Sequence, residues 1–230
     1  MKKIKLIILI IALTMGVVLL FNKSIGHFLI ASNGIKISKS QFEHNNKSKN
    51  HNANFDWNKT APLSSTDIVK ARLTSPSYIG LISIPDLNVM LPISPGTSNE
   101  SLSLGAGTLF PNQKMGADNY SLASHFVQGS NNKALLFSPI YYHGKAGQKI
   151  YLTDLENVYE YKATLVKVIK ASDVSVTDNV PGKKLITLIT CDYTADRGRV
   201  LMQGKLISVT KWQKSSHDVK EQFTKKAQIL

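Results

Sequence analysis

The sequence contains a single cysteine. Among 230 residues, Cys191 stands alone. One thiol cannot form an internal disulfide, so no disulfide framework supports the fold, and cysteine usage does not identify the compartment. A lone thiol in an exported protein is a candidate reactive group, whereas a buried one is simply a small hydrophobic side chain. Local composition leaves both interpretations open.

Arginine is also scarce. The chain has 28 Lys and Arg residues, of which only Arg72, Arg197 and Arg199 are arginines. Two of them follow Cys191 within eight residues. A lysine-rich chain that uses arginine here indicates a need for a planar fork of donors with a charge that does not titrate. The alternative is an ordinary solvated turn.

The positive charge is not spread over the chain, although the net charge is +13. Residues 1–50 carry eight lysines and one glutamate, whereas residues 76–210 carry twelve basic and ten acidic residues. A groove for nucleic acid would place the excess within the folded region. The distribution instead favours a basic segment beside an anionic membrane surface.

The N-terminal region is the longest apolar stretch. Leu6–Phe21 has sixteen residues without a charge, somewhat fewer than the ~20 of a spanning helix. Ile4 and the apolar residues of 25–31 extend it. A cleaved signal peptide and an uncleaved anchor are both compatible with this pattern. We favour the anchor because Leu29-Ile30-Ala31 lacks a small residue at the first position. The preceding lysines predict a cytoplasmic N-terminus and an extracellular remainder.

Composition divides the chain into four parts. Residues 1–31 are predicted to be a cytoplasmic basic stub and membrane anchor. Residues 32–75 are predicted to be a polar linker that ends in a short helix at 64–73, with Ile68, Ala71 and Leu73 on one side. Residues 76–210 are predicted to form a catalytic β-barrel, and residues 211–230 a charged tail.

Residues 76–210 alternate between short apolar runs and turn signals such as Pro85-Asp86, Pro95-Gly96 and Pro181-Gly182. The predicted strands are Tyr78–Ile84, Leu87–Ile93, Gly105–Phe110, Asn119–His125, Gln148–Asp154, Val158–Ile169, Leu185–Cys191 and Arg199–Val209. A brief helical turn is expected at 134–140. Eight short strands with little helix predict a mostly β fold, a closed or nearly closed antiparallel barrel.

Two reactive side chains end predicted strands. His125 ends NYSLASH, and Cys191 ends LITLITC. Side chains at the ends of two strands of one barrel can share a rim, where a thiol and an imidazole form a nucleophile and its base. The alternative for His125 is an ordinary histidine at a surface edge.

Several ordered motifs resemble those of sortases. TLITC, followed eight residues later by Arg199 and an apolar strand, is similar to the family's TLxTC signature. Residues 78–107 resemble the class A pattern of IPxxxxxLPI followed by GT and GAG. Residues 119–125 resemble the LAGH stretch, and 135–140 the LFSPL stretch. The resemblance covers roughly residues 76–210 and implies a closed eight-stranded sortase-type barrel with short helices, preceded here by a transmembrane helix.

The resemblance to class A, housekeeping sortases implies a triad of Cys191, His125 and Arg199. Cys191 would attack the Thr–Gly bond of an LPxTG-type sorting signal, and His125 would protonate the departing amine. Arg199 would stabilise the oxyanion or hold substrate. An amine of lipid II or of the peptidoglycan cross-bridge would then resolve the thioester. The implied setting is the membrane of a Gram-positive bacterium, with the catalytic domain outside and surface proteins as partners.

Three further residues are candidates for substrate binding: Thr190, Ser124 and Arg197. Strand alternation does not separate Arg197 from Arg199, and Arg199 is chosen because the family's arginine directly precedes an apolar run. Ser124 replaces the family's usual glycine, and its β-carbon is expected to tighten the cleft or shift its backbone. No cofactor is expected. Some sortases use calcium, but the spacing of Glu100, Asp173 and Asp178 does not support such a site.

Other functions are compatible with parts of this pattern. A cysteine hydrolase of wall peptides would use the same Cys–His pair without preferring an amine to water. A non-catalytic binding module would bury Cys191 as an unreactive thiol. A pilus-building sortase would usually carry a lid and a second C-terminal span, and no apolar run exists near residue 220.

Overall fold

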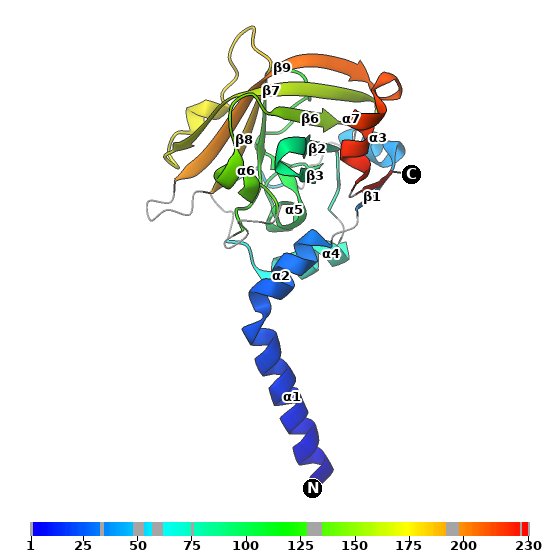
Figure 1. Cartoon of the computed structure of the whole chain (residues 1–230), viewed down its shortest axis with the longest axis vertical. Coiled ribbons are helices and arrows are strands. Elements are labelled where there is room, and N and C mark those ends of the chain that lie inside the picture. Colours follow the sequence, from blue (N-terminus) through cyan, green and yellow to red (C-terminus); the bar gives the residue numbers. More distant parts are fainter. Residues whose placement is uncertain are drawn as a thin grey trace.

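The computed structural model describes a β-barrel above a long N-terminal helix (Figure 1). The residues described are 2–32, 35–47, 53–56, 62–74, 76–127, 135–191, 198–225 and 227–229. In this part of the chain, eight strands close into a barrel in the order β2-β3-β4-β5-β8-β9-β7-β6. Their bounds are Gly80–Ile84 (β2), Val89–Ser94 (β3), Ala106–Thr108 (β4), Asn119–Ala123 (β5), Lys149–Thr153 (β6), Asn157–Ile169 (β7), Leu185–Cys191 (β8) and Arg199–Lys211 (β9).

The predicted closed barrel is confirmed, but it is not purely antiparallel. β3 pairs with β4 in parallel, and so does β5 with β8. The physical reason lies in the connections. A short helix, α5 (Asn99–Leu104), carries the chain from the end of β3 back to the start of β4. Strands joined by such a crossover run in the same direction, whereas hairpins give antiparallel pairs.

Side-chain alternation explains how each strand faces both the core and the outer surface. On β8, Ile186 and Leu188 point into the main core of the barrel. Ile189 belongs to a second cluster, which it forms with Leu109, Ile169 and Leu201. Val176, from the 3-10 turn Val174–Thr177 between β7 and β8, packs against this second cluster. The sheet formed by β5, β8 and β9 therefore has an apolar outer face as well as an apolar interior.

The N-terminal region forms two helices, α1 (Lys2–Leu20) and α2 (Asn22–Ala31). Over the residues that the structure describes, no single helix is both long and apolar enough to cross a membrane. Lys3–Val17 and Asn22–Ala31 meet that requirement only together, as a pair bent by 67°. The continuous transmembrane helix predicted from the sequence is therefore not confirmed, and the anchor stays a prediction.

The predicted linker contains the helix α4 (Ser65–Thr74), which begins where the sequence indicates. The Ser64 hydroxyl accepts a hydrogen bond from the backbone N–H of Asp67 at 3.1 Å and so caps the first turn. Ile68 and Ala71 are buried as predicted, but Leu73 is 81% exposed. Residue 73 was wrongly assigned because its position lies well away from the buried side of the helix.

The linker and tail predictions are wrong in part. Residues 35–37 form strand β1 (Ile35–Ile37), and the helix α3 (Lys39–Lys47) follows it. At the other end of the chain, α7 (His217–Thr224) precedes β10 (Ala227–Ile229), which pairs in parallel with β1. Ile37, Phe42 and Phe223 are buried in one cluster with barrel residues. A few large apolar side chains in polar sequence are enough to hold both segments against the barrel. The remaining predicted linker residues, 33–34, 48–52 and 57–61, lie outside the described part.

The helical turn predicted at 134–140 appears slightly later, as α6 (Ser138–His143). The Ser138 hydroxyl accepts a hydrogen bond from the backbone N–H of Val127 at 2.7 Å. This bond joins α6 to the chain that leaves β5 beyond His125. Both segments therefore border the same end of the barrel.

Candidate active site

Three strand ends meet at one end of the barrel. β5 and β8 are parallel, with Ala123 opposite Ile189. The pairing continues past the end of β5, where the Ser124 N–H donates to the Ile189 carbonyl at 3.1 Å. β8 and β9 are antiparallel, and Cys191 is the register partner of Arg199. The chain segments at 125, 191 and 199 are therefore neighbours, as the sequence predicted for a shared rim.

Strand periodicity places two of these positions on the outer face of the barrel. Position 199 has the parity of Leu201, and position 191 has the parity of Ile189, both members of the outer apolar cluster. Val200 and Met202, with the opposite parity, belong to the main core. The rim thus continues onto an apolar outer surface.

His125 lies just beyond β5, which ends at Ala123 rather than at the histidine. Its side chain is 6% exposed, and its Nε2 atom is buried without a hydrogen-bond partner among the described residues. Burial lowers the pKa of His125 to about 4, while the charge of Asp67 acts in the opposite direction. The imidazole is therefore neutral at pH 7 and can accept a proton at a free nitrogen.

This burial predicts an acid-dependent loss of stability. The ordinary pKa of histidine is 6.5 and that of folded His125 is about 4, so between these values the unfolded chain binds more protons. Stability due to the neutral histidine is complete above pH 6.5 and is lost as the pH falls to 4, by about 3 kcal/mol. This loss of stability is measured by urea unfolding of the wild type and of His125→Gln at pH 7 and at pH 4. A wild-type pH dependence no steeper than that of the variant would contradict the prediction.

Two other buried hydroxyls at this end of the barrel have no partner among the described residues. They are the Thr190 Oγ1 and the Ser94 Oγ. Ser94 ends β3, and its register partner on β4 is Gly107, which in turn pairs with Ala123. Buried hydroxyls are normally satisfied, so unpaired ones beside a candidate site are consistent with a role in binding.

Ser124 has a different setting. Its hydroxyl donates to the carbonyl of Gly105 at 2.6 Å, and its side chain is buried. The serine that replaces the family's glycine therefore ties the segment before His125 to the start of β4. The hydrogen bond explains how the additional β-carbon and hydroxyl are accommodated.

Arg199 is partly buried, and its Nη1 donates to the carbonyl of Gly198 at 3.2 Å. Its backbone pairing with Cys191 fixes its place beside the candidate nucleophile. The competing Arg197 lies outside the described residues, as do the other residues between 192 and 197. Of the two arginines, the geometry therefore describes only Arg199.

Sequence reasoning missed a polar network that holds the connection between β7 and β8. The side-chain amide of Asn119 donates to the carbonyls of Val176 at 3.1 Å and Asp178 at 3.0 Å. Its oxygen accepts a hydrogen bond from the Thr187 hydroxyl at 2.7 Å, and Gln203 donates to both Thr187 and Val176. The available signal was the outward parity of the polar residues Asn119, Thr187 and Gln203 on β5, β8 and β9. This network fixes Val176 over the apolar outer face.

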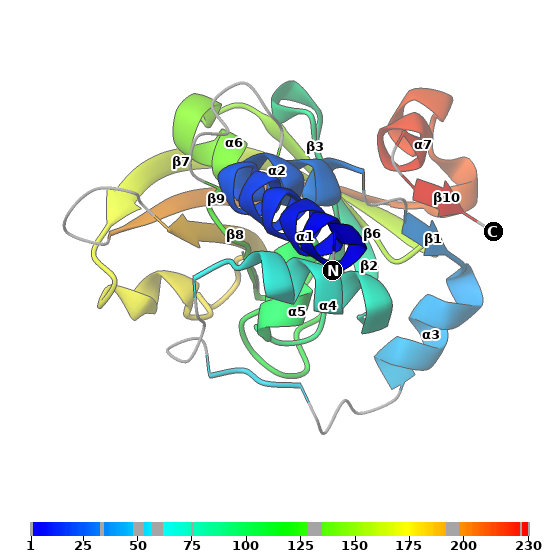
Figure 2. The ribbon, with the colours of Figure 1, turned by 90° about the horizontal axis from the view of Figure 1, so that it is seen from below.

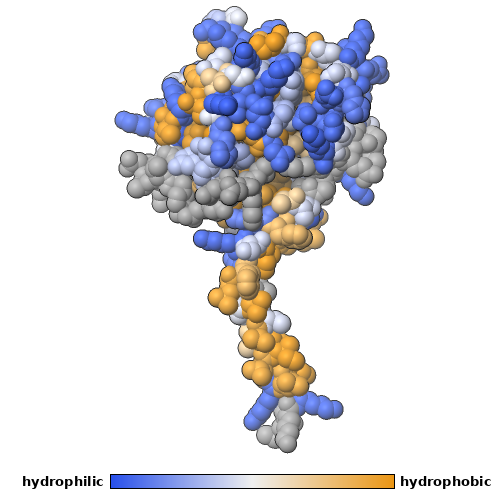
Figure 3. Space-filling view, viewed as in Figure 1, coloured by the Kyte–Doolittle hydropathy of each residue, from blue (hydrophilic) through white to orange (hydrophobic). Residues whose placement is uncertain are grey.

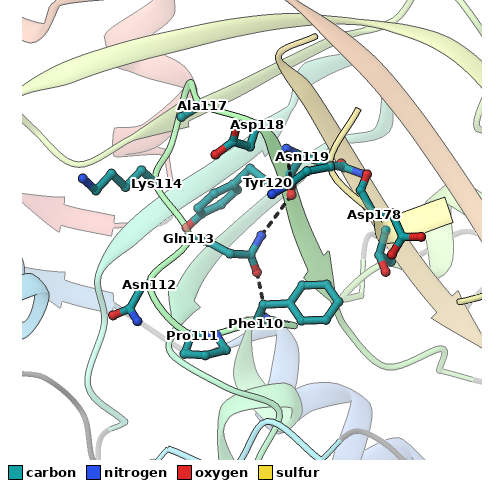
Figure 4. Close-up of a pocket in the computed structure, with 12 residues that line it drawn as sticks. Phe110, Pro111, Asn112, Gln113, Lys114, Ala117, Asp118, Asn119, Tyr120 and Asp178 are labelled. Carbon is teal, nitrogen blue, oxygen red and sulfur yellow. Dashed lines mark hydrogen bonds between the residues drawn. The ribbon is translucent and has the colours of Figure 1, made fainter. Parts of the chain in front are cut away.

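A hollow of about 420 Å³ lies at the start of β5, where the chain before Asn119 faces Thr177–Asn179. In Figure 4 the Gln113 side chain bridges the backbone of Phe110 and Asn119 within it. His125 follows the opposite end of β5 and does not line this hollow. The hollow is therefore separate from the candidate active site.

Metal-ligating side chains gather elsewhere. Among the described residues, His217, Asp218 and Glu221 are grouped closely enough to share an ion, and all three are exposed on α7. Within the same described residues, Glu100, Asp173 and Asp178 do not form such a group. Glu100 instead pairs with Lys70 of α4. Exposed acidic groups of this kind are not a metal site by themselves.

With this geometry established, known proteins offer a direct comparison. A family model for the sortase domain matches residues 82–207, which run from β2 to β9 and include all three candidate catalytic residues.

The chain belongs to the sortase family. Sortase A of Streptococcus agalactiae serotype III (strain NEM316) is 34% identical, over 97% of this chain and 92% of the relative. Sortase A of Listeria monocytogenes serovar 1/2a (strain ATCC BAA-679 / EGD-e) is 36% identical, over 88% and 91%. The crystal structure of Listeria monocytogenes sortase A superposes with a TM-score of 0.57 at 39% identity, covering 64% of this chain and 96% of that one.

Family membership has a general functional meaning. Sortases cleave sorting signals and transfer the protein to the cell wall. Residues 125, 191 and 199 of this sortase therefore come together in a fold whose family performs cysteine-dependent transpeptidation.

Proposed function

We propose that this sortase is a class A, membrane-anchored cysteine transpeptidase that cleaves LPxTG-type sorting signals between Thr and Gly. The observation that supports the proposal most directly is the pairing of Cys191 with Arg199 at the barrel end where His125 emerges. A thiol, an imidazole and a fixed positive charge at neighbouring positions support the proposed roles of nucleophile, base and oxyanion stabiliser.

In the first half-reaction, the Cys191 sulfur attacks the carbonyl carbon of the signal's threonine. Neutral His125 accepts the thiol proton, because its lowered pKa leaves the imidazole unprotonated at pH 7. Arg199 stabilises the negative charge that develops on the carbonyl oxygen. The C–N bond then breaks, the imidazolium returns its proton to the glycine amine, and a thioester remains.

In the second half-reaction, an amine of a cell-wall precursor attacks the thioester carbonyl. His125 accepts a proton from the amine and delivers it to the departing Cys191 sulfur. A peptide bond forms, the thioester breaks, and the free enzyme returns without net change in protons. We propose lipid II or the peptidoglycan cross-bridge as the source of this amine. The thiol, imidazole and guanidinium supply every group the reaction needs, so no cofactor is proposed.

The substrate surface follows from the outer face of the sheet. Ala123 and Val176 are partly buried and border the apolar cluster beside the rim. We assign the leucine and proline of the sorting signal to this surface, because apolar side chains gain free energy by leaving water there. Thr190, Ser124 and Arg197 remain proposed contributors to substrate binding, Ser124 through the position of its backbone.

The membrane anchor is part of the same proposal. α1 exposes apolar side chains along its length, and lysines stand at its N-terminal end. We propose that it lies in the cell membrane with the N-terminus in the cytoplasm and the barrel outside.

The full chain in detergent, mixed with an LPxTG peptide with and without an amine acceptor, tests the activity. The expected products, identified by mass spectrometry, are a peptide cut after Thr and joined to the amine, and a thioester on Cys191. EDTA should leave the rate unchanged. Cleavage with no capture of amine would favour the hydrolase, and an intact peptide with an unreactive thiol would favour the binding module.

A further inference from the structure

The helices α2 and α4 lie side by side beneath the barrel (Figure 2). The Ser65 hydroxyl donates to the side-chain oxygen of Asn22 at 2.5 Å. Near the other end of the pair, the Arg72 Nη1 donates to the carbonyl of Leu29 at 2.9 Å. Between these bonds, a Cβ at Gly26 would lie 3.7 Å from the Ile68 side chain, so the backbones approach closely. The two helices are therefore packed together, and we call the pair the platform.

One side of this platform is buried and the opposite side is apolar. Ile30, Ile68 and Ala71 belong to the main core. On α4, Val69 and Leu73 lie one turn apart, well around the helix from Ile68 and Ala71. They are 45% and 81% exposed. Phe21 directly precedes α2, and with Ile25 and Phe28 it forms a stripe that is likewise turned away from Ile30; Phe28 is 68% exposed. We call these five residues the lower apolar face: Phe21, Ile25, Phe28, Val69 and Leu73.

The lower apolar face continues the apolar surface of α1. Figure 3 shows nearly continuous orange surface along the N-terminal helix and at its junction with the barrel, whereas the coloured barrel surface above mixes blue with orange. The axis bends by 67° between Lys3–Val17 and Asn22–Ala31. If α1 lies within a bilayer, α2 therefore turns sideways where the chain leaves it.

We propose that the lower apolar face rests in the interfacial layer of a phospholipid bilayer, the one that holds α1. This inference depends on the anchor of the proposed function. Amphipathic helices bind bilayers through an apolar side that enters the boundary between headgroups and acyl chains.

The length of α1 and the charges around the face are consistent with a bilayer as occupant. The uncharged part of α1, residues 6–20, rises about 22 Å, so a hydrocarbon core of ~30 Å extends to the start of α2. Lys23 is exposed at the start of α2 and can reach headgroup phosphates. Two charged groups of α4 are already engaged within the protein: the Asp67 carboxylate accepts a bond from the Ser64 hydroxyl, and Lys70 pairs with Glu100.

The platform also connects the bilayer to the catalytic end of the barrel. α4 packs on α5, whose last residue precedes Gly105. The Gly105 carbonyl accepts the hydrogen bond from Ser124, the neighbour of His125. Docking of the platform would therefore hold the His125 rim near the bilayer surface, where an amine carried on a lipid is concentrated.

Tryptophan placed on the lower apolar face tests the proposal. The full chain, with Trp57 and Trp212 replaced by phenylalanine, is reconstituted into phosphatidylglycerol–phosphatidylcholine vesicles that contain brominated lipid. A Leu73→Trp variant should be quenched at least about threefold more than a variant with tryptophan outside the interface. The matched control is Ile207→Trp, because Ile207 on β9 is also apolar and 58% exposed.

Flotation of the same vesicles separates the possible failures. A chain that does not float with the vesicles would overturn both the anchor and the docking. A chain that floats while the Leu73→Trp and Ile207→Trp variants are quenched equally would overturn the docking alone. Transpeptidation of a soluble peptide with a soluble amine is measured in parallel, and its absence would count against the proposed activity while leaving the quenching result decisive for the docking.

Discussion

Replacement of Cys191 by alanine is expected to reduce transpeptidation by at least ~10⁴-fold, because no covalent intermediate can form without the thiol. The remaining groups at positions 125 and 199 could still bind substrate and polarise its carbonyl, but the amide exchange would lose its two-step route. The measurement is the rate of peptide–amine product formation by the full chain. Mass spectrometry should show no acyl adduct on the variant.

The single cysteine makes this experiment unusually direct. Since Cys191 is the only thiol, any thiol-linked adduct on the wild type must be at that position. Thermal unfolding of the variant should match that of the wild type, which separates lost chemistry from a lost fold. Product formation near the wild-type rate would refute the role of Cys191 as the nucleophile.

Arg199→Ala is expected to lower the rate by about 10²–10³-fold, the cost of removing one charge-stabilising donor from an acyl-transfer site. Arg199 is fixed beside Cys191 by the pairing of β8 with β9, so its loss acts where the oxyanion develops. Arg199→Lys should recover only part of the rate, because an ammonium group lacks the planar fork of donors.

A matched control is available on the same strand. Lys205→Ala also removes one positive charge from β9, but Lys205 pairs with Leu185 at the other end of β8. Its rate should stay close to that of the wild type. Equal losses in both variants would mean that net charge, rather than the position of Arg199, determines the rate.

Much of the barrel and the site was predictable because it depends on local patterns. β8 and β9 begin at the predicted residues 185 and 199, since alternating apolar residues and flanking turns define strands locally. The rim followed from two predicted strand ends that carry reactive side chains, although β5 itself ends two residues before His125. The family motifs then favoured catalytic roles over a buried cysteine and an edge histidine, alternatives that composition alone left open.

Other features depend on contacts between distant residues and could not be obtained in this way. The parallel pairing of β5 with β8 joins segments separated by more than 60 residues. Phe42 and Phe223 lie in polar sequence, and their burial becomes apparent only when each meets the barrel. The role of Asn119 likewise requires Thr187 and Val176 to be in place.

The pairing of β1 with β10 has a consequence for how far a barrel anchored as proposed can extend from the membrane. Ile35–Ile37 is held against Ala227–Ile229, so the first part of the polar stretch after α2 runs along the barrel instead of acting as a leash. The barrel is thus kept close to the proposed anchor, α1, and its active site can reach only a short distance from the membrane. Because Ile30 of α2 and Ile37 of β1 are both buried against the barrel, removal of Ala227–Ile229 alone should leave the reach of the barrel unchanged.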